Sequence, residues 1–77
     1  MVYPRLKLVA RRKELELSQE QVADKAGLSR AYYTNIERGA KNPSLATAQR
    51  IAKVLETSVD DLFFDHTVPY RNSTATG

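Results

Sequence analysis

The stretch SQEQVADKAGLSRAYYTNIERG, residues 18–39, carries start and stop signals for two short helices. Ser18 stands three residues before Gln21, which is the spacing of a capping box at a helix N-terminus. Ser29 suits the N-cap of a second helix. Gly27 and Gly39 suit the left-handed conformation that ends many helices. The stretch therefore predicts two helices joined by the short turn AGLS.

A turn this short makes two helices cross steeply and pack at close range. Ala23 is small at the position where the two helices would touch, and Gly27 can adopt a left-handed backbone. The apolar contacts are expected from Val22, Ala26, Leu28, Tyr33 and Ile36. This is the helix-turn-helix arrangement, in which the second helix enters the DNA major groove. Helical hairpins are common, so the outer surface of the second helix has to support this interpretation.

That outer surface has the side chains of a DNA-reading helix. At 100° per residue, Arg30, Thr34 and Arg38 form one line, and Ala31 and Asn35 form the line beside it. Arg can donate to guanine, Asn can pair with adenine, and an Ala methyl can contact thymine. Thr34 and Arg38 suit phosphate. An ordinary solvated helix surface would tend to carry Glu–Lys pairs four residues apart, and this surface has none.

The rest of the chain predicts three more helices. Pro4 opens a helix from Arg5 to about Glu16, and Ser58 precedes a short helix VDDLFF. Ser44 caps a further helix with apolar positions at Leu45, Ala48, Ile51, Ala52 and Leu55. No segment alternates with period two. We expect one all-α domain of five helices over residues 1–64, followed by a flexible polar tail over residues 65–77.

Composition limits the class of protein. The chain has 77 residues, a net charge of +3 and no Cys, which excludes disulfides and favours a single domain with a thin core. No apolar run is long enough for a membrane span and no signal peptide is evident, so the expected location is the cytoplasm. The single His, His66, lies in the predicted tail, and there is no Gly-rich phosphate loop. We therefore expect no enzyme, no catalytic residue, no metal and no cofactor.

The chain also resembles the lambda-repressor-like, Cro-like regulators, often called the XRE family. The resemblance runs from about Leu8 to Phe63 and is carried by LSQEQVADKAGLSRAYYTNIERGAKNPSLATAQRIAKVL followed by SVDDLF. It implies a five-helix domain that binds double-stranded DNA. By position, it implies base contacts from Arg30, Ala31 and Asn35. It implies backbone contacts from Gln19, Tyr32, Arg38, Lys41 and Asn42, with Gln19 also bracing the reading helix.

The resemblance implies a structural pair as well, and it has three departures. Glu37 is expected to form a partly buried pair with Arg12. The alternatives are a surface charge at Glu37 that balances Arg38, and a direct DNA contact by Arg12. Tyr33 stands where the family usually has Ile or Val, and its hydroxyl is expected to emerge toward DNA. Glu16 replaces a common Gly, and Arg11 replaces a small or apolar residue, so the first helix and its connection are expected to differ from the usual pattern.

One reading helix covers too few base pairs for a specific site, so a homodimer on a palindromic operator is expected, acting as a repressor or autoregulator. The candidate interface is Val59, Phe63 and Phe64, because Phe64 points about 100° away from Phe63. The alternative is that Phe64 folds back and caps the thin core. The alternative function is a protein-binding module on the same fold, such as an antitoxin with an unidentified protein partner. Binding of the domain alone to palindromic DNA would discriminate the two functions.

Overall fold

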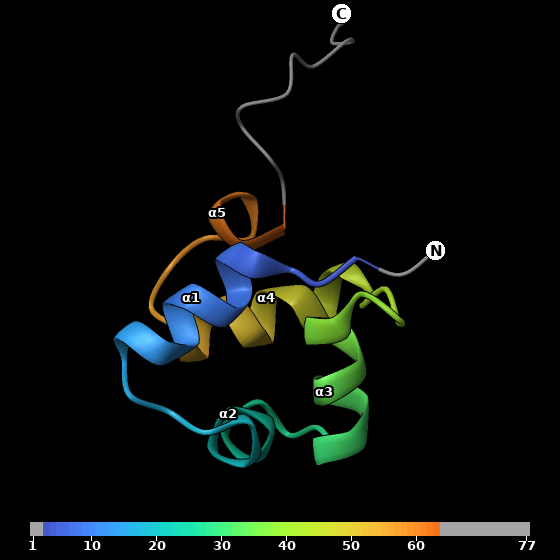
Figure 1. The fold of residues 1–77 in the computed structure, drawn as a ribbon, viewed down its shortest axis with the longest axis horizontal. Helices are drawn as coiled ribbons and strands as arrows, with labels where there is room; N and C mark the ends of the chain where they lie inside the picture. The colour runs from blue at the N-terminus through green and yellow to red at the C-terminus, as the bar shows by residue number, and fades with distance from the viewer. Residues whose placement is uncertain (1–2, 64–77) are drawn as a thin grey trace, which may run out of the picture.

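The computed structural model describes residues 3–63, and this part of the chain is folded into five helices with no strand (Figure 1). In chain order they are α1 (Leu6–Glu14), α2 (Gln19–Ala26), α3 (Arg30–Arg38), α4 (Leu45–Val54) and α5 (Val59–Phe63). The predictions of an all-α fold and of five helices are confirmed. The predicted tail, residues 65–77, and the predicted interface residue Phe64 lie outside the described residues.

The helix ends lie where the capping residues predict them. The Ser18 hydroxyl accepts from the Gln21 backbone N–H, and the Gln21 side chain accepts from the Ser18 N–H, which completes the capping box. The hydroxyls of Ser29 and Ser44 cap α3 and α4 by accepting from the backbone N–H groups of Tyr32 and Thr47. Gly27 and Gly39 follow α2 and α3 with φ of 73° and 82°. These local signals determine where α2, α3 and α4 begin and where α2 and α3 end.

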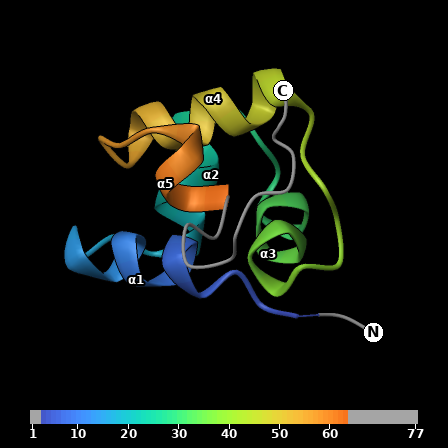
Figure 2. The same cartoon turned by 90° about the horizontal axis from the view of Figure 1, so that it is seen from above.

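The core lies between the helices, as Figure 2 shows from above. α4 packs against α2 and α5, while α1 packs against α5 and α3. The buried apolar side chains are Leu8, Val22, Ala23, Ala26, Tyr33, Ile36, Ala48, Ile51, Ala52, Leu55 and Leu62. The prediction that Leu45 belongs to the apolar face of α4 is wrong. Leu45 is 67% exposed, because it is the first residue of α4 and the buried side of that helix begins at Ala48.

α1 ends two residues earlier than predicted, and both unusual residues near its end have a structural explanation. Glu16 adopts the left-handed conformation, with φ of 57°, that a Gly would adopt without strain. The guanidinium of Arg11 donates to the backbone oxygens of Leu55 and Glu56, at 2.8 and 3.3 Å. A cation at the C-terminal end of α4 satisfies carbonyl groups that have no partner within the helix.

Within residues 3–63, none of the helices has the length and apolar character that a transmembrane helix requires.

Candidate nucleic-acid interface

The α2–α3 unit positions the candidate interface. In Figure 1, α2 is seen nearly end-on while α3 runs down the page, so the two helices cross steeply. The turn between them is fixed by Gly27 and by the Leu28 N–H, which donates to the Ala23 oxygen at 2.8 Å. Tyr33 and Ile36, on the inner side of α3, are fully buried. The inner side of α3 is therefore anchored in the core and its outer side faces solvent.

The outer side of α3 carries the predicted base-contacting residues. Arg30, Ala31 and Arg38 are exposed, and Thr34 and Asn35 are partly buried beside them. Arg38 Nη1 donates to Asn35 Oδ1 at 2.7 Å, so these two side chains contact each other along the helix. The structure places all five side chains on one side of α3, in the rows that the helical spacing predicts.

Gln19, at the start of α2, connects the two helices. Its Nε2 donates to Glu37 Oε1 at 3.0 Å, and its Oε1 accepts from Thr34 Oγ1 at 3.3 Å. Both partners belong to α3. Gln19 therefore braces α3 through both polar atoms of its amide.

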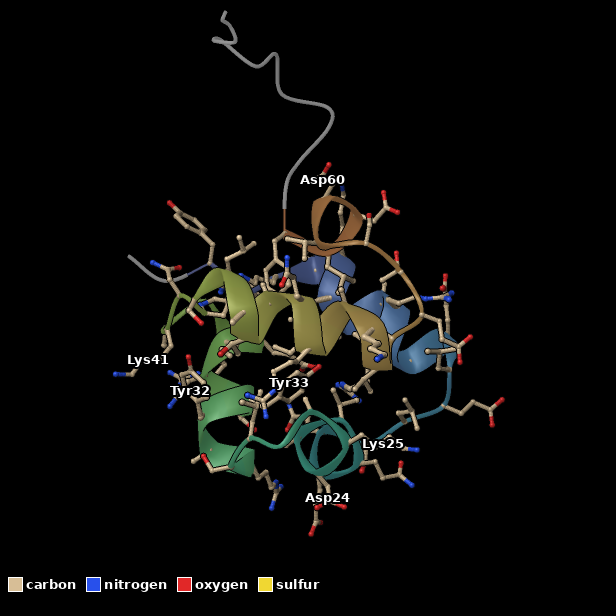
Figure 3. The ribbon with its side chains drawn as sticks, turned by 180° about the vertical axis from the view of Figure 1, so that it is seen from behind. Asp24, Lys25, Tyr32, Tyr33, Lys41 and Asp60 are labelled. Atoms are coloured by element: carbon tan, nitrogen blue, oxygen red, sulfur yellow. The ribbon has the colours of Figure 1, made fainter. Side chains whose placement is uncertain are left out.

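The remaining predicted backbone contacts lie on α3 and on the loop that follows it. Tyr32 is partly buried and Lys41 and Asn42 are exposed. Figure 3 shows Tyr32 and Lys41 on the same side of the molecule, while Tyr33 points into the interior. Asn42 is held by the chain itself, because its Oδ1 accepts from Arg5 Nη2 at 2.7 Å.

Arg5 is a residue that the sequence analysis did not single out. Its Nη1 donates to the backbone oxygens of Ile36, at 2.7 Å, and Lys41, at 3.2 Å, and its guanidinium lies 5.6 Å from the centre of the Phe63 ring. Partial burial lowers the pKa of Arg5. These contacts join the N-terminal segment to the end of α3, the following loop and α5. An Arg beside a Pro gives no signal of such a role in the sequence.

Glu37 is the only acid of α3, and it is buried with hydrogen-bond donors from three residues around it. Arg12 Nε and the Tyr33 hydroxyl each donate to Glu37 Oε2 at 2.6 Å, and Gln19 Nε2 donates to Oε1 at 3.0 Å. Burial by itself would raise the pKa of the Glu37 carboxyl, but hydrogen bonds from Arg12, Tyr33 and Gln19 outweigh burial and lower it. The hydrogen bond with Glu37 raises the pKa of Arg12. The arrangement keeps an ion pair charged inside the domain.

The expected direction of the Tyr33 hydroxyl is wrong. Tyr33 is fully buried, and its hydroxyl donates to Glu37 instead of emerging toward DNA. A buried carboxylate requires donors, and a Tyr one helical turn earlier supplies one. Burial, followed by the bond to Glu37, raises the pKa of Tyr33, so the hydroxyl remains a donor.

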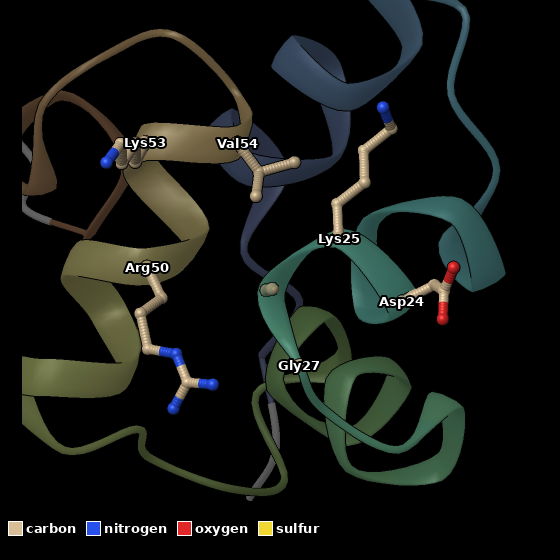
Figure 4. Close-up of a pocket in the computed structure, with 7 residues that line it drawn as sticks. Asp24, Lys25, Gly27, Arg50, Lys53 and Val54 are labelled. Carbon is tan, nitrogen blue, oxygen red and sulfur yellow. The ribbon is translucent and has the colours of Figure 1, made fainter.

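The predicted interface residues Val59 and Phe63 are partly buried on α5. They line a groove together with Arg5, Asn42, Pro43, Leu45 and Ala48. A second, more polar groove lies between α2 and α4, lined among others by Gly27, Arg50 and Lys53 (Figure 4). Among residues 3–63 no group of His, Cys, Asp or Glu side chains is arranged to hold a metal ion.

The fold and the outward side chains of α3 define a helix-turn-helix domain of the DNA-binding type. The model of the HTH_3 helix-turn-helix family matches residues 8–62, and the chain belongs to this family of transcriptional regulators. The resemblance to lambda-repressor-like regulators is thereby confirmed.

Named relatives agree with this assignment. The chain is 42% identical over 62 residues to the immunity repressor protein of Bacillus phage phi105, covering 80% of this chain and 43% of the phage protein. It resembles the restriction-modification controller protein C.AhdI from Aeromonas hydrophila, with a TM-score of 0.70, 37% identity, and coverage of 74% of this chain and 86% of the other. The chain also resembles SinR from Bacillus subtilis in a structure with DNA, with a TM-score of 0.68 and 35% identity. This likeness covers 73% of this chain and 90% of the SinR chain. The chain thus spans less than half of the phage repressor and most of the two structural relatives.

Proposed function

We propose that this chain represses transcription by binding a palindromic operator as a homodimer, with one α3 in the major groove at each half-site. The observation that carries the proposal is the charge on α3. Its single acid, Glu37, is 3% exposed and paired with Arg12, while Arg30 and Arg38 are exposed. The outer side of α3 therefore presents positive charge with no acid, which suits a surface that approaches phosphates and base edges.

The base contacts are assigned to Arg30, Ala31 and Asn35. Arg30 and Ala31 are exposed near the N-terminal end of α3, the part of a recognition helix that contacts base edges. Asn35 lies one turn further along, with Arg38 bound to its side-chain oxygen. Arg recognises guanine and Asn recognises adenine through paired hydrogen bonds. These three residues determine which sequence is preferred.

The backbone contacts are assigned to residues on both sides of that row. Arg38 and Lys41 supply charge, and Gln19, Tyr32, Thr34 and Asn42 supply hydrogen-bonding groups. Phosphate contacts fix the orientation of the protein without selecting a sequence. Arg5, which holds the side chain of Asn42 and the backbone of Lys41, keeps the loop after α3 in place for these contacts.

A dimer is proposed because one helix covers only a few base pairs, and two helices on a two-fold axis cover two half-sites about 34 Å apart. The proposed interface is the surface of Leu45, Val59 and Phe63, and Phe64 is the next residue of the chain. In Figure 1, α5 lies across the domain from the N-terminal end of α3. Pairing through this surface leaves the reading helices uncovered. The name of the phage relative, an immunity repressor, supports repression as the outcome.

Selection of bound sequences from a random DNA pool tests the proposal. The expected product is a palindrome whose half-sites are separated by about one helical turn. Fluorescence anisotropy on that site should show log K falling against log salt with a slope of about −4, since Arg38 and Lys41 of two subunits would contact phosphates. A slope near zero, or no enrichment of any sequence, would contradict DNA recognition and favour the protein-binding alternative.

A further inference from the structure

A chain of hydrogen bonds runs from the buried core to the surface of the candidate interface. The Tyr33 hydroxyl donates to Glu37 Oε2 at 2.6 Å. The other carboxylate oxygen, Oε1, accepts from Gln19 Nε2 at 3.0 Å. Gln19 Oε1 in turn accepts from Thr34 Oγ1 at 3.3 Å. The side chain of Gln19 is thereby connected to a hydroxyl group that DNA cannot reach.

Burial decreases along this chain. Tyr33 and Glu37 are 0% and 3% exposed, whereas Gln19 and Thr34 are only partly buried. In Figure 3, Tyr33 lies in the interior of the domain, away from Tyr32 on its outer side. The inner end is therefore held by core packing, and the outer end lies where backbone contacts are proposed.

Glu37 determines which way the Gln19 amide faces. The terminal amide of Gln is able to turn over. Its two orientations interchange the positions of the NH2 group, which donates, and the oxygen, which accepts. Only one orientation places the NH2 group on the Glu37 carboxylate and the oxygen on the Thr34 hydroxyl. This orientation uses one N–H of Gln19 toward Glu37 and leaves its second N–H for a phosphate.

Tyr33 in turn holds the Glu37 carboxylate. Arg12 reaches both carboxylate oxygens, with Nε at 2.6 Å and Nη2 at 3.2 Å, and the Tyr33 hydroxyl adds a second short bond to Oε2. Without that bond, only Arg12 and Gln19 hold the carboxylate, whose terminal torsion has a broad energy profile and is then less restricted. Rotation would displace the oxygen that Gln19 contacts.

We propose that Tyr33 is a positioning residue for DNA binding: through Glu37, its buried hydroxyl holds the Gln19 amide in the orientation that contacts the DNA backbone. The inference rests on the proposed function, since it assigns the Gln19 contact to phosphate. It assigns a role in binding to a side chain that is itself inaccessible to DNA. It also gives the Tyr33 hydroxyl a role that the ring, which fills the core, does not supply.

A double-mutant cycle tests this role. Dissociation constants for a random-sequence duplex are measured by fluorescence anisotropy for the wild type, Tyr33→Phe, Gln19→Ala and the double variant. Tyr33→Phe keeps the ring and removes only the hydroxyl. It should weaken binding about fivefold in the wild-type background and less than about twofold in the Gln19→Ala background. Equal losses in both backgrounds, or no loss in either, would overturn the proposal.

A stability control separates positioning from loss of folded protein. Ile51→Val removes one methylene from a fully buried residue of α4, and it should lower the melting temperature while leaving DNA affinity within about twofold of the wild type. A loss of affinity with Ile51→Val as large as that with Tyr33→Phe would attribute the effect to stability and overturn the proposal.

NMR provides a measurement that does not depend on DNA. The Gln19 side-chain NH2 signals are assigned by their absence in Gln19→Ala, and Tyr33→Phe should shift them while Ile51→Val should not. Unchanged Gln19 signals in Tyr33→Phe would overturn the proposal even if DNA affinity fell. If the wild type bound no duplex, the proposed function would fail together with this inference. If the wild type bound the duplex but Tyr33→Phe and Gln19→Ala weakened binding independently in the cycle, only this inference would be overturned.

Discussion

Arg12 Nε lies 2.6 Å from Glu37 Oε2 and joins α1 to α3, with the two side chains only 12% and 4% exposed. Arg12 Nη1 also donates to the Leu17 oxygen at 2.8 Å, which connects the pair to the segment before α2. One largely buried guanidinium on α1 therefore contacts both α3 and the segment before α2. The same carboxylate binds Tyr33 and Gln19, so the pair supports both the core and the proposed interface.

Removing either partner of this pair should destabilise the domain strongly. Arg12→Ala and Glu37→Ala should each lower the free energy of unfolding by about 3–5 kcal/mol, because each leaves an unpaired charge inside the protein. Urea denaturation monitored by circular dichroism measures the change. Lys13→Ala, at an exposed neighbouring position, is the control and should change stability by less than about 0.5 kcal/mol. Losses of similar size in all three variants would show that Arg12 and Glu37 contribute no more than a surface charge.

Acid should destabilise the domain through Glu37. The pKa of this carboxyl is lower in the folded protein than its ordinary value of 4.5, since the hydrogen bonds from Arg12, Tyr33 and Gln19 outweigh burial. A lowered folded pKa gives a stabilisation that is present above about pH 4.5 and is lost as the pH falls through the folded value. Glu37→Gln should therefore flatten the decline of unfolding free energy below pH 4.5. Glu20→Gln, which removes an exposed charge on α2, should keep the wild-type decline; an unchanged decline in Glu37→Gln would contradict the assignment.

Replacing Glu16 should stabilise the connection between α1 and α2. A residue with a Cβ is strained by roughly 1–2 kcal/mol in the left-handed conformation that Glu16 adopts, with φ of 57°. Glu16→Gly removes that strain but loses chain entropy, so a net gain of about 0.5–1 kcal/mol is expected. Thermal melting measures it. Glu16→Ala is the matched control, because it removes the same charge and keeps the Cβ; an equal gain in Glu16→Ala would assign the effect to charge.

Substitutions on the outer side of α3 should change specificity. Arg30→Ala and Asn35→Ala should each lose about 1–3 kcal/mol of binding free energy on the selected operator, with little change on random DNA, because base contacts are made only with the preferred sequence. Anisotropy titrations on both duplexes measure the difference. Arg50→Ala, an exposed Arg of α4, controls for the loss of one positive charge. Equal losses on operator and random DNA would assign Arg30 and Asn35 to phosphates instead.

Local chemistry explains why much of the fold could be predicted. A Ser cap or a Gly after a helix acts within a few residues of its own position, as Ser18 and Gly27 do, so both are visible in the sequence. Helical periodicity likewise placed Arg30, Thr34 and Arg38 in one row. The family resemblance supplied the pairing of Arg12 with Glu37, which no local pattern indicates.

The parts that could not be predicted depend on contacts between distant segments. Arg5 binds backbone oxygens more than thirty residues away, and nothing beside it in the sequence encodes those partners. Tyr33 and Glu37 are one turn apart, but the direction of the Tyr33 hydroxyl depends on the buried Arg12 and Gln19 around the carboxylate. Leu45 fits the apolar period of α4 and yet lies beyond the part of that helix that other helices cover.

Dimerisation should depend on Leu45. This side chain is 67% exposed and lines a groove with Ala48, Val59 and Phe63, so in a two-fold arrangement each Leu45 is able to enter the groove of the other subunit. Burying a Leu contributes about 1.5–3 kcal/mol, and Leu45→Ser should raise the dimer dissociation constant at least about tenfold. Sedimentation velocity at micromolar protein, with and without the selected palindrome, measures this change. Leu6→Ser is the matched control, because Leu6 is 71% exposed on α1 and does not line the groove, so it should sediment as the wild type does. If Leu45→Ser dimerises as well as Leu6→Ser, or if the wild type remains monomeric on palindromic DNA, the α4–α5 surface is not the dimer interface.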